Sequence, residues 1–168
     1  DSIFLMDTLI KIKVTGVNSE KVIEECLSRL KEIDRRMNAS DPDSDVSKIN
    51  KNSGKAVKIH EDTLVVLKKA LKFARISRGK FDPTVGALVN LWGIGTKKAG
   101  IPDKKEIKKT LSTIDYKKVE LNEKENTVKL KQEGTFLHLG GITKGYAADE
   151  VKKIISSHYK NPSAYINL

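Results

Sequence analysis

Long apolar runs are missing from this 168-residue sequence, and so is any repeated cysteine pattern. No stretch approaches the roughly 20 consecutive apolar residues that cross a bilayer, so no membrane-spanning helix is expected. Cys26 is the single cysteine, which excludes an internal disulfide framework and a cysteine metal site. It falls on the apolar face of a predicted helix, where we expect a core residue and not a reactive thiol.

Acidic residues are in the minority, with 22 Asp and Glu against 32 Lys and Arg, which gives a net charge of +10. A nucleic-acid-binding protein would cluster its cations and interleave aromatic residues for stacking. Here aromatic residues make up only 5%, and the lysines are scattered over every segment. We therefore expect solvated surface lysines with some attraction for anions such as phosphates, and no nucleic-acid partner. A basic scaffold or nucleic-acid-binding domain stays as a rival hypothesis that rests on charge alone.

A basic-then-apolar leader is also missing at the start, and the chain stops within a strand-like stretch, SAYINL (163–168). If the native protein is exported, we expect its signal to have been removed here. A final strand with no turn or polar tail predicts the front part of a longer protein. Residues 1–168 have the length and apolar content, 38%, of a single globular domain.

Alternating and helical spacings of apolar residues predict an α+β fold, a largely antiparallel sheet with helices packed against it. Within residues 3–14, Leu9, Lys11 and Lys13 alternate with Ile10, Ile12 and Val14, which predicts a strand with one buried face, and the predicted order of elements begins with two strands and a helix. A loop over 38–55 contains a short turn of helix with Val46 and Ile49, and 117–138 form a meander of three short strands. The predicted helices cover about 19–37, 61–77, 103–111 and 143–157.

The stretch FDPTVGALVNLWGIG (81–95) is unusual, because it combines three glycines with the only tryptophan of the chain. Asp82 precedes Pro83, so its side chain is expected to cap a helix that begins at the proline. That structural role is a strong alternative to any role in binding. Trp92 could likewise have a purely structural role, as an aromatic residue in the core or at its edge.

Two further stretches have polar residues suited to ligands. LGGITKGYAAD (139–149) predicts a strand, a Gly-Gly turn and a helix whose N-terminus favours anions. Lys144 in the first turn opposes the helix dipole, which suggests an anionic ligand, although a surface lysine beside a turn is an equal alternative. MNASDPDSDVSKIN (37–50) resembles a calcium-binding loop but lacks the C-terminal glycine and glutamate of an EF-hand. Its polar residues are compatible either with a loop that caps a helix or with a loop that faces a ligand.

Together and in this order, FLMDT, PDSDVSKIN, GKFDPTVGALVNLWGIG and LGGITKGYAAD resemble the ApbE family of FAD:protein FMN transferases, over essentially all 168 residues. The resemblance implies an ApbE-like, T-fold-related domain that is cut before its C-terminal half. It also implies FAD as substrate, Mg²⁺, and transfer of FMN to a threonine or serine hydroxyl of a target protein with release of AMP. An extracytoplasmic lipoprotein attached to the cytoplasmic membrane by a lipid anchor is the expected location.

The resemblance also assigns site residues. Met6 is expected to line the flavin; Lys80, Phe81 and Asp82 match the segment that contacts FAD, and Lys144 matches a cofactor-contacting position. Residues 84–95 would be mainly the packed wall behind that segment. Gly141 is expected to offer its backbone carbonyl to the metal, which suits the few protein ligands of Mg²⁺.

Two positions depart from the family pattern. Ser40 stands where relatives often stack an aromatic residue on the flavin, so that contact is expected to be absent or supplied elsewhere. His138 stands where an acidic residue is usual, and its imidazole can hydrogen-bond the cofactor with a pH-dependent charge. These departures favour an alternative function, an FAD-binding module without transferase activity. The family's main metal-binding carboxylate and threonine lie in the missing half, so this chain alone is expected to be catalytically incomplete.

Overall fold

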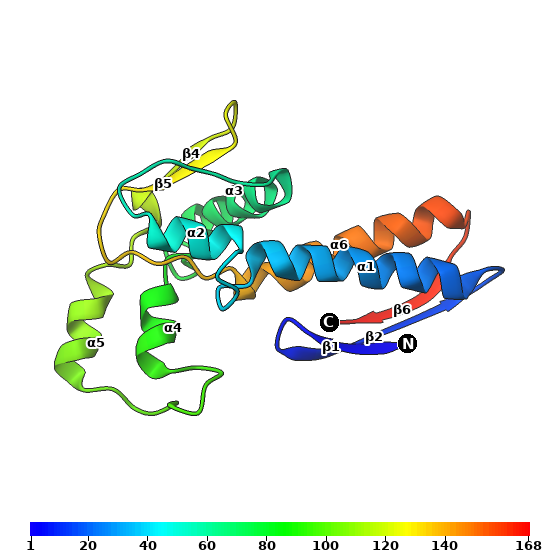
Figure 1. Ribbon diagram of the computed structural model, residues 1–168, viewed down its shortest axis with the longest axis horizontal. Coiled ribbons are helices and arrows are strands. Elements are labelled where there is room, and N and C mark those ends of the chain that lie inside the picture. The colour runs from blue at the N-terminus through cyan, green and yellow to red at the C-terminus, as the bar shows by residue number, and fades with distance from the viewer. The chain divides into compact units, whose positions relative to one another are not determined.

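The structure, a computed structural model, describes residues 1–168, and the chain forms two compact units. Unit 1 combines Asp1–Arg35 with Ile142–Leu168, and unit 2 is Arg36–Gly141. Figure 1 shows the elements of both. The predicted α+β class with antiparallel strands is confirmed, but the strands form two three-stranded sheets where one was expected. The single domain over 1–168 stays a prediction.

The sheet of unit 1 has the order β1-β2-β6, with both pairs antiparallel. Its strands are β1 (Ser2–Leu5), β2 (Thr8–Thr15) and β6 (Ser163–Asn167). The strand predicted from the alternation of residues 9–14 is confirmed as β2, and a two-residue turn at Met6 and Asp7 joins it to β1 in a hairpin. Both residues have positive φ, 52° and 57°, as a type I′ turn requires, and glycine or asparagine would suit such a turn better.

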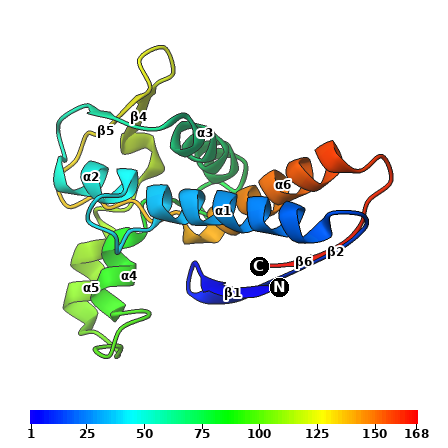
Figure 2. The same cartoon turned by 45° about the vertical axis from the view of Figure 1, so that its right-hand side comes forward.

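Two long helices, α1 (Ser19–Met37) and α6 (Gly140–His158), lie on the same side of this sheet in both ribbon views (Figures 1 and 2). Alternate residues of β2 are buried, and the helices bury an apolar stripe each. The buried side chains include Ile10, Ile12, Val22, Cys26, Leu30, Val151 and Ile155. Burial raises the pKa of the Cys26 thiol to about 11, so this cysteine is an inert core residue. None of the helices has the length and apolar character needed to span a membrane.

Unit 2 contains a second sheet of order β3-β5-β4, with every pair antiparallel. The hairpin of β4 (Val119–Asn122) and β5 (Thr127–Leu130) lies where the meander was predicted, and β3 (Val57–Lys58) is short. Helices α2 (Asp45–Lys51) and α3 (Glu61–Ile76) also match their predicted positions. The third predicted strand of the meander is absent, because residues 135–139 make only one isolated bridge, Val85 to Phe136.

Helices α4 (Gly86–Trp92) and α5 (Lys104–Leu111) lie side by side in both ribbon views (Figures 1 and 2). Two glycines of the 81–95 stretch have clear structural causes. A Cβ at Gly86 would lie 2.7 Å from the carbonyl oxygen of Phe136, so only glycine allows this close approach. Gly93, at φ 62°, ends α4 with a Schellman motif in which Ile94 N donates to the Val89 carbonyl.

Candidate functional site

Asp82 forms hydrogen bonds to two segments of unit 2 that lie far apart in the sequence. Its Oδ1 accepts hydrogen bonds from Thr84 N at 2.8 Å and Thr84 Oγ1 at 2.6 Å, and its Oδ2 accepts one from Tyr116 N at 3.0 Å. The hydroxyl of Thr84, which is fully buried, in turn accepts from Asp115 N at 3.0 Å. The predicted cap of a helix at Pro83 was therefore wrong, since α4 begins only at Gly86 and has no side-chain cap. Asp82 positions the segment that precedes α4.

Phe81 and His138 both lie against the glycine pair that opens α6. A Cβ at Gly141 would lie 3.2 Å from Phe81 Cε2, and one at Gly140 would lie 2.7 Å from His138 Cε1. Side chains at these two positions would displace the rings, so the glycines allow both rings to approach the helix start. The backbone supports this arrangement, because His138 N donates to the Pro83 carbonyl at 2.9 Å. Unit 2 thus brings together Phe81, Asp82, His138 and Gly141, four of the predicted site residues.

Asn50 is a further residue of this region that the sequence did not single out. Its Nδ2 donates to the Leu137 carbonyl at 3.0 Å, and its Oδ1 accepts from Leu137 N at 2.7 Å. The amide therefore replaces the neighbouring strand that residues 135–139 lack, next to His138. The sequence feature that could have indicated Asn50 is its place as a polar residue at the end of the amphipathic turn in PDSDVSKIN. Its partner could not be predicted, because Leu137 lies 87 residues away in the sequence.

The loop at the start of this motif makes the hydrogen bonds of a capping loop. Ser44 Oγ accepts from Ser47 N and caps α2, while Asp45 Oδ2 accepts from His60 N and from Thr63 Oγ1 at 2.7 Å. Of the two open alternatives, these bonds support the structural one for Ser44 and Asp45. Ser40 is exposed, and its backbone N–H donates to Asn38 Oδ1. No hydrogen bond links the Ser40 side chain to the other predicted site residues.

The remaining predicted residues are Met6, Lys80 and Lys144. Met6 is half-buried at the tip of the β1–β2 hairpin, and Lys80 is exposed directly before Phe81. Lys144 is half-buried on α6, but that helix begins at Gly140 and not at 143. The glycine pair is therefore inside the first turn, and Lys144 follows it in the second. Its predicted opposition to the helix dipole is weaker than the sequence indicated, since that effect fades within one turn.

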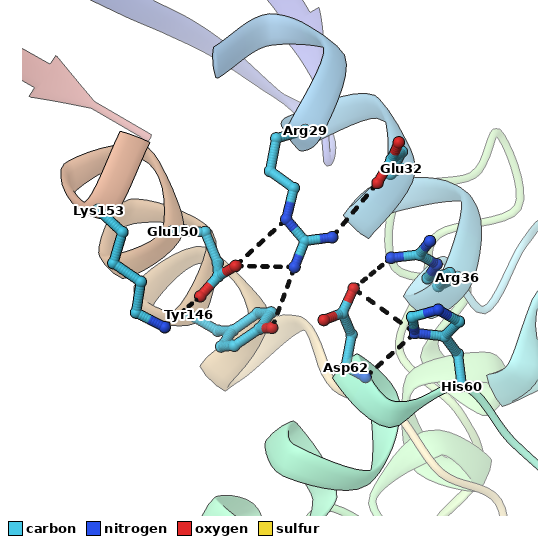
Figure 3. A network of polar contacts seen from close by, with 8 residues as sticks. All are labelled: Arg29, Glu32, Arg36, His60, Asp62, Tyr146, Glu150 and Lys153. Atoms are coloured by element: carbon cyan, nitrogen blue, oxygen red, sulfur yellow. Dashed lines mark hydrogen bonds and ion pairs between the residues drawn. The ribbon is translucent and has the colours of Figure 1, made fainter. Parts of the chain in front are cut away.

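An ion-pair network joins the two long helices within unit 1 (Figure 3). Arg29 of α1 donates from Nη2 to Glu150 Oε2 at 2.8 Å and to the Tyr146 hydroxyl at 3.3 Å, both on α6. Lys153 also donates to Glu150, at 2.6 Å. Burial raises the pKa of the Glu150 carboxyl, but the hydrogen bonds from Lys153 and Arg29 outweigh it and leave that pKa below its usual value. The network fixes the α6 helix that carries Lys144.

A second group in Figure 3 belongs to unit 2. Asp62, at the start of α3, pairs with Arg36, and its backbone N–H donates to Nδ1 of the capping His60 at 3.2 Å. An acceptor Nδ1 means that the ring carries its proton on Nε2 when neutral. These bonds satisfy a buried carboxylate and a helix start, so we interpret the group as structural.

The described residues contain no group of three or more His, Cys, Asp or Glu side chains placed to hold a metal ion. The prediction for this chain is a single ligand, the Gly141 carbonyl. One backbone oxygen is a suitable donor for Mg²⁺, which prefers oxygen ligands and keeps several waters or phosphate oxygens. The glycines, the helix start and Lys144 are likewise suited to a diphosphate. The donors present here therefore fit both Mg²⁺ and the diphosphate of FAD.

Known proteins resemble this chain over most of its length. It is 31% identical over 164 residues to an FAD:protein FMN transferase of Treponema pallidum, covering 92% of this chain and 45% of the relative. It is 30% identical over 141 residues to an FAD:protein FMN transferase of Haemophilus influenzae, covering 79% of this chain and 40% of the relative. The chain thus spans less than half the length of these two relatives.

Solved structures have the same fold. The ApbE protein of Thermotoga maritima superposes with a TM-score of 0.93 at 33% identity, covering 99% of this chain and 55% of that one. A point mutant of the flavin transferase ApbE from Vibrio cholerae superposes with a TM-score of 0.88 at 25% identity, covering 99% and 59%. The profile of the ApbE family matches residues 6–168, a span that includes every predicted site residue. This chain belongs to the ApbE family.

Proposed function

We propose that the full-length protein transfers FMN from FAD to a serine or threonine hydroxyl of a target protein, with Mg²⁺. The observation that carries the proposal is the family match over 6–168, because it includes all eight predicted site positions. The names of the relatives, FAD:protein FMN transferase, support it. Because the chain spans less than half of these relatives, the rest of the protein is expected to complete the activity.

The proposed reaction breaks the phosphoanhydride bond of FAD and forms a phosphate ester bond on the acceptor. The acceptor hydroxyl oxygen forms a bond to the phosphorus of the FMN part of FAD and gives up its proton. The bond between that phosphorus and the bridging oxygen breaks, and AMP leaves with the electron pair. Negative charge grows on the phosphate oxygens during this exchange, so cationic donors that meet them there contribute most.

Six of the eight predicted site residues have a stated role in this proposal. Lys144 supplies a positive charge to the diphosphate, and the first amides of α6 favour an anion through their partial positive charge. Gly141 offers its carbonyl to Mg²⁺, which when bound would withdraw negative charge from phosphate oxygens. Phe81 and His138 present ring edges beside the glycine pair, while Asp82 holds Phe81 in place. Met6, which is half-buried at the tip of the β1–β2 hairpin, lines the flavin.

AMP release separates this proposal from the alternative of an FAD-binding module. Full-length protein is incubated with FAD, Mg²⁺ and a threonine-containing target peptide, and the nucleotides are separated by chromatography. A transferase releases one AMP for each modified peptide, and release stops when the threonine is replaced by valine. FAD binding with no AMP release would support the binding module instead.

We also propose an extracytoplasmic location for the native protein, attached to the cytoplasmic membrane as a lipoprotein. The proposal rests on the family alone, and its consequence is a lipid-modified cysteine ahead of residue 1 in the precursor. Labelling of cells with a fatty-acid analogue tests it. Label on the full-length protein supports the anchor, and unlabelled protein in the cytoplasmic fraction contradicts it.

A further inference from the structure

A pocket of about 450 Å³ lies beside the Asp82 turn in unit 2 and is lined by residues from two segments. Its walls come from the end of α3 and from the stretch before β4. The lining is Arg75, Arg78, Gly79, Asp82, Ile114, Asp115, Tyr116 and Lys117. Pockets of this size accommodate small organic ligands.

Three cations line this pocket, and none of their side chains has a hydrogen-bond or ion-pair partner in the structure. They are Arg75 and Arg78 from the end of α3, and Lys117 from the other wall. The two carboxylates of the lining, Asp82 and Asp115, offset two of these three charges, although neither forms an ion pair with the cations. Asp82 uses both oxygens on Thr84 and Tyr116, and Asp115 Oδ1 accepts from Lys117 N at 3.0 Å.

Arg78 adopts a backbone conformation that an arginine would not choose. Its φ is 55°, in the left-handed region, and the next residue, Gly79, has φ 80°. Glycine or asparagine is favoured there, so the arginine accepts strain. Arg78 N donates to the Arg75 carbonyl and Gly79 N to the Ala74 carbonyl, a Schellman motif that places Arg78 in the left-handed region at the end of α3. The helix dipole favours a cation such as Arg75 in the last turn of α3, but it does not explain Lys117 on the other wall.

We propose that this pocket binds a phosphate monoester. The two guanidinium groups and one ammonium group exceed the two carboxylates of the lining by one positive charge, and arginine forks match phosphate oxygens in pairs. Tyr116 and Ile114 add a ring and an aliphatic side chain to the lining, against which an organic group packs. The inference stands on the pocket alone and does not depend on the transfer reaction.

The test titrates full-length protein with inorganic phosphate, AMP and uncharged adenosine, and measures binding by calorimetry. Arg78→Gly removes the cation and relieves the backbone strain, so the variant stays folded with an unchanged or higher Tm. Its affinity for phosphate and for AMP should fall at least tenfold. Lys72→Gln is the matched control, because it removes one exposed charge from the same α3 helix and should change affinity less than twofold.

Two results would overturn the proposal. One is an equal affinity of Arg78→Gly and Lys72→Gln for phosphate, which would mean unspecific attraction to a basic protein. The other is adenosine binding as tightly as AMP, which would mean that the phosphate is not recognised. Lys144→Ala keeps the two proposals apart, because it should weaken FAD binding and leave the phosphate affinity of this pocket unchanged.

Discussion

Asn50 pairs with the backbone of Leu137 through both ends of its side-chain amide, at 3.0 and 2.7 Å. Leu137 is 1% exposed, so its N–H and its carbonyl both lose their hydrogen-bond partner if the amide is removed. The pair holds residues 135–139 in an extended conformation, although they belong to no sheet. His138 and the glycine pair follow directly, so the position of the helix start depends on this contact.

Asn50→Ala should therefore cost much more stability than its small change in volume suggests. It leaves a buried N–H and a buried carbonyl of Leu137 unpaired, at about 1–3 kcal/mol each. Urea unfolding of the full-length protein measures the loss. The control Asn161→Ala, at an exposed position, should stay within about 0.5 kcal/mol of wild type. Equal midpoints for the two variants would mean that the Asn50 amide does not support this segment.

Asp82→Asn should destabilise the protein even though asparagine caps helices as well as aspartate does. The amide keeps one oxygen for Thr84, but its N–H₂ group would face the N–H of Tyr116 and leave it unpaired, which costs about 1–3 kcal/mol. Asp115→Asn is a close control, because Asp115 Oδ1 alone accepts from Lys117 N and an amide oxygen preserves that bond. Both variants are compared by urea unfolding and by FAD titration.

Asp82→Asn is expected to lower both stability and FAD affinity, since the turn positions Phe81. Asp115→Asn is expected to leave both nearly unchanged. If the two variants had the same unfolding midpoint, the bond to Tyr116 N would contribute nothing. If Asp82→Asn bound FAD as wild type does, its role would be structural only.

Lys144→Ala in the full-length protein tests the proposed contact with the diphosphate. Loss of one charge-assisted hydrogen bond costs about 1.5–3 kcal/mol, or roughly ten- to a hundredfold in affinity. Lys152→Ala, an exposed lysine on the same helix, removes the same charge and should change FAD affinity little. Fluorescence titration with FAD measures both. Equal affinities for the two variants would remove Lys144 from the binding site.

The Arg29–Glu150 pair should make stability fall in acid. Glu150 has a native pKa below that of its unfolded state, so unfolding takes up a proton as the pH falls below about 4.5. The contribution of the pair is fully present above the unfolded pKa and is lost as pH falls through the native pKa. Glu150→Gln should cost about 1–3 kcal/mol at pH 7, with the difference from wild type shrinking toward pH 3. A difference independent of pH would contradict this.

Periodicity in the sequence predicted the elements whose stability is local or amphipathic. The helices α1, α2, α3 and α5 and the β4–β5 hairpin all lie within a few residues of their predicted positions. Each has an apolar stripe, a cap or a turn residue within its own segment. The family resemblance then gave the four short motifs expected roles in binding FAD and Mg²⁺, which residue chemistry alone had left open.

Long-range partners explain what the sequence did not predict. Residues 135–139 alternate like a strand, but they pair with a side-chain amide from α2 and with one bridge to Val85. The hairpin turn at Met6 and Asp7 contains no glycine or asparagine to indicate it. Asp82 looked like a local cap because Pro83 follows it, yet one of its oxygens is bound by Tyr116 N, 34 residues away. No residue pattern at a fixed spacing in the sequence indicates any of these contacts.

The most direct test of the central claim is the intact mass of an acceptor protein after incubation with the full-length protein, FAD and Mg²⁺. The proposal predicts a mass gain of one FMN group on the acceptor, located on a serine or threonine by fragmentation. The gain should disappear when that residue is replaced by valine or when EDTA removes the metal. An acceptor whose mass stays unchanged, in the presence of protein that binds FAD tightly, would contradict the proposed transfer.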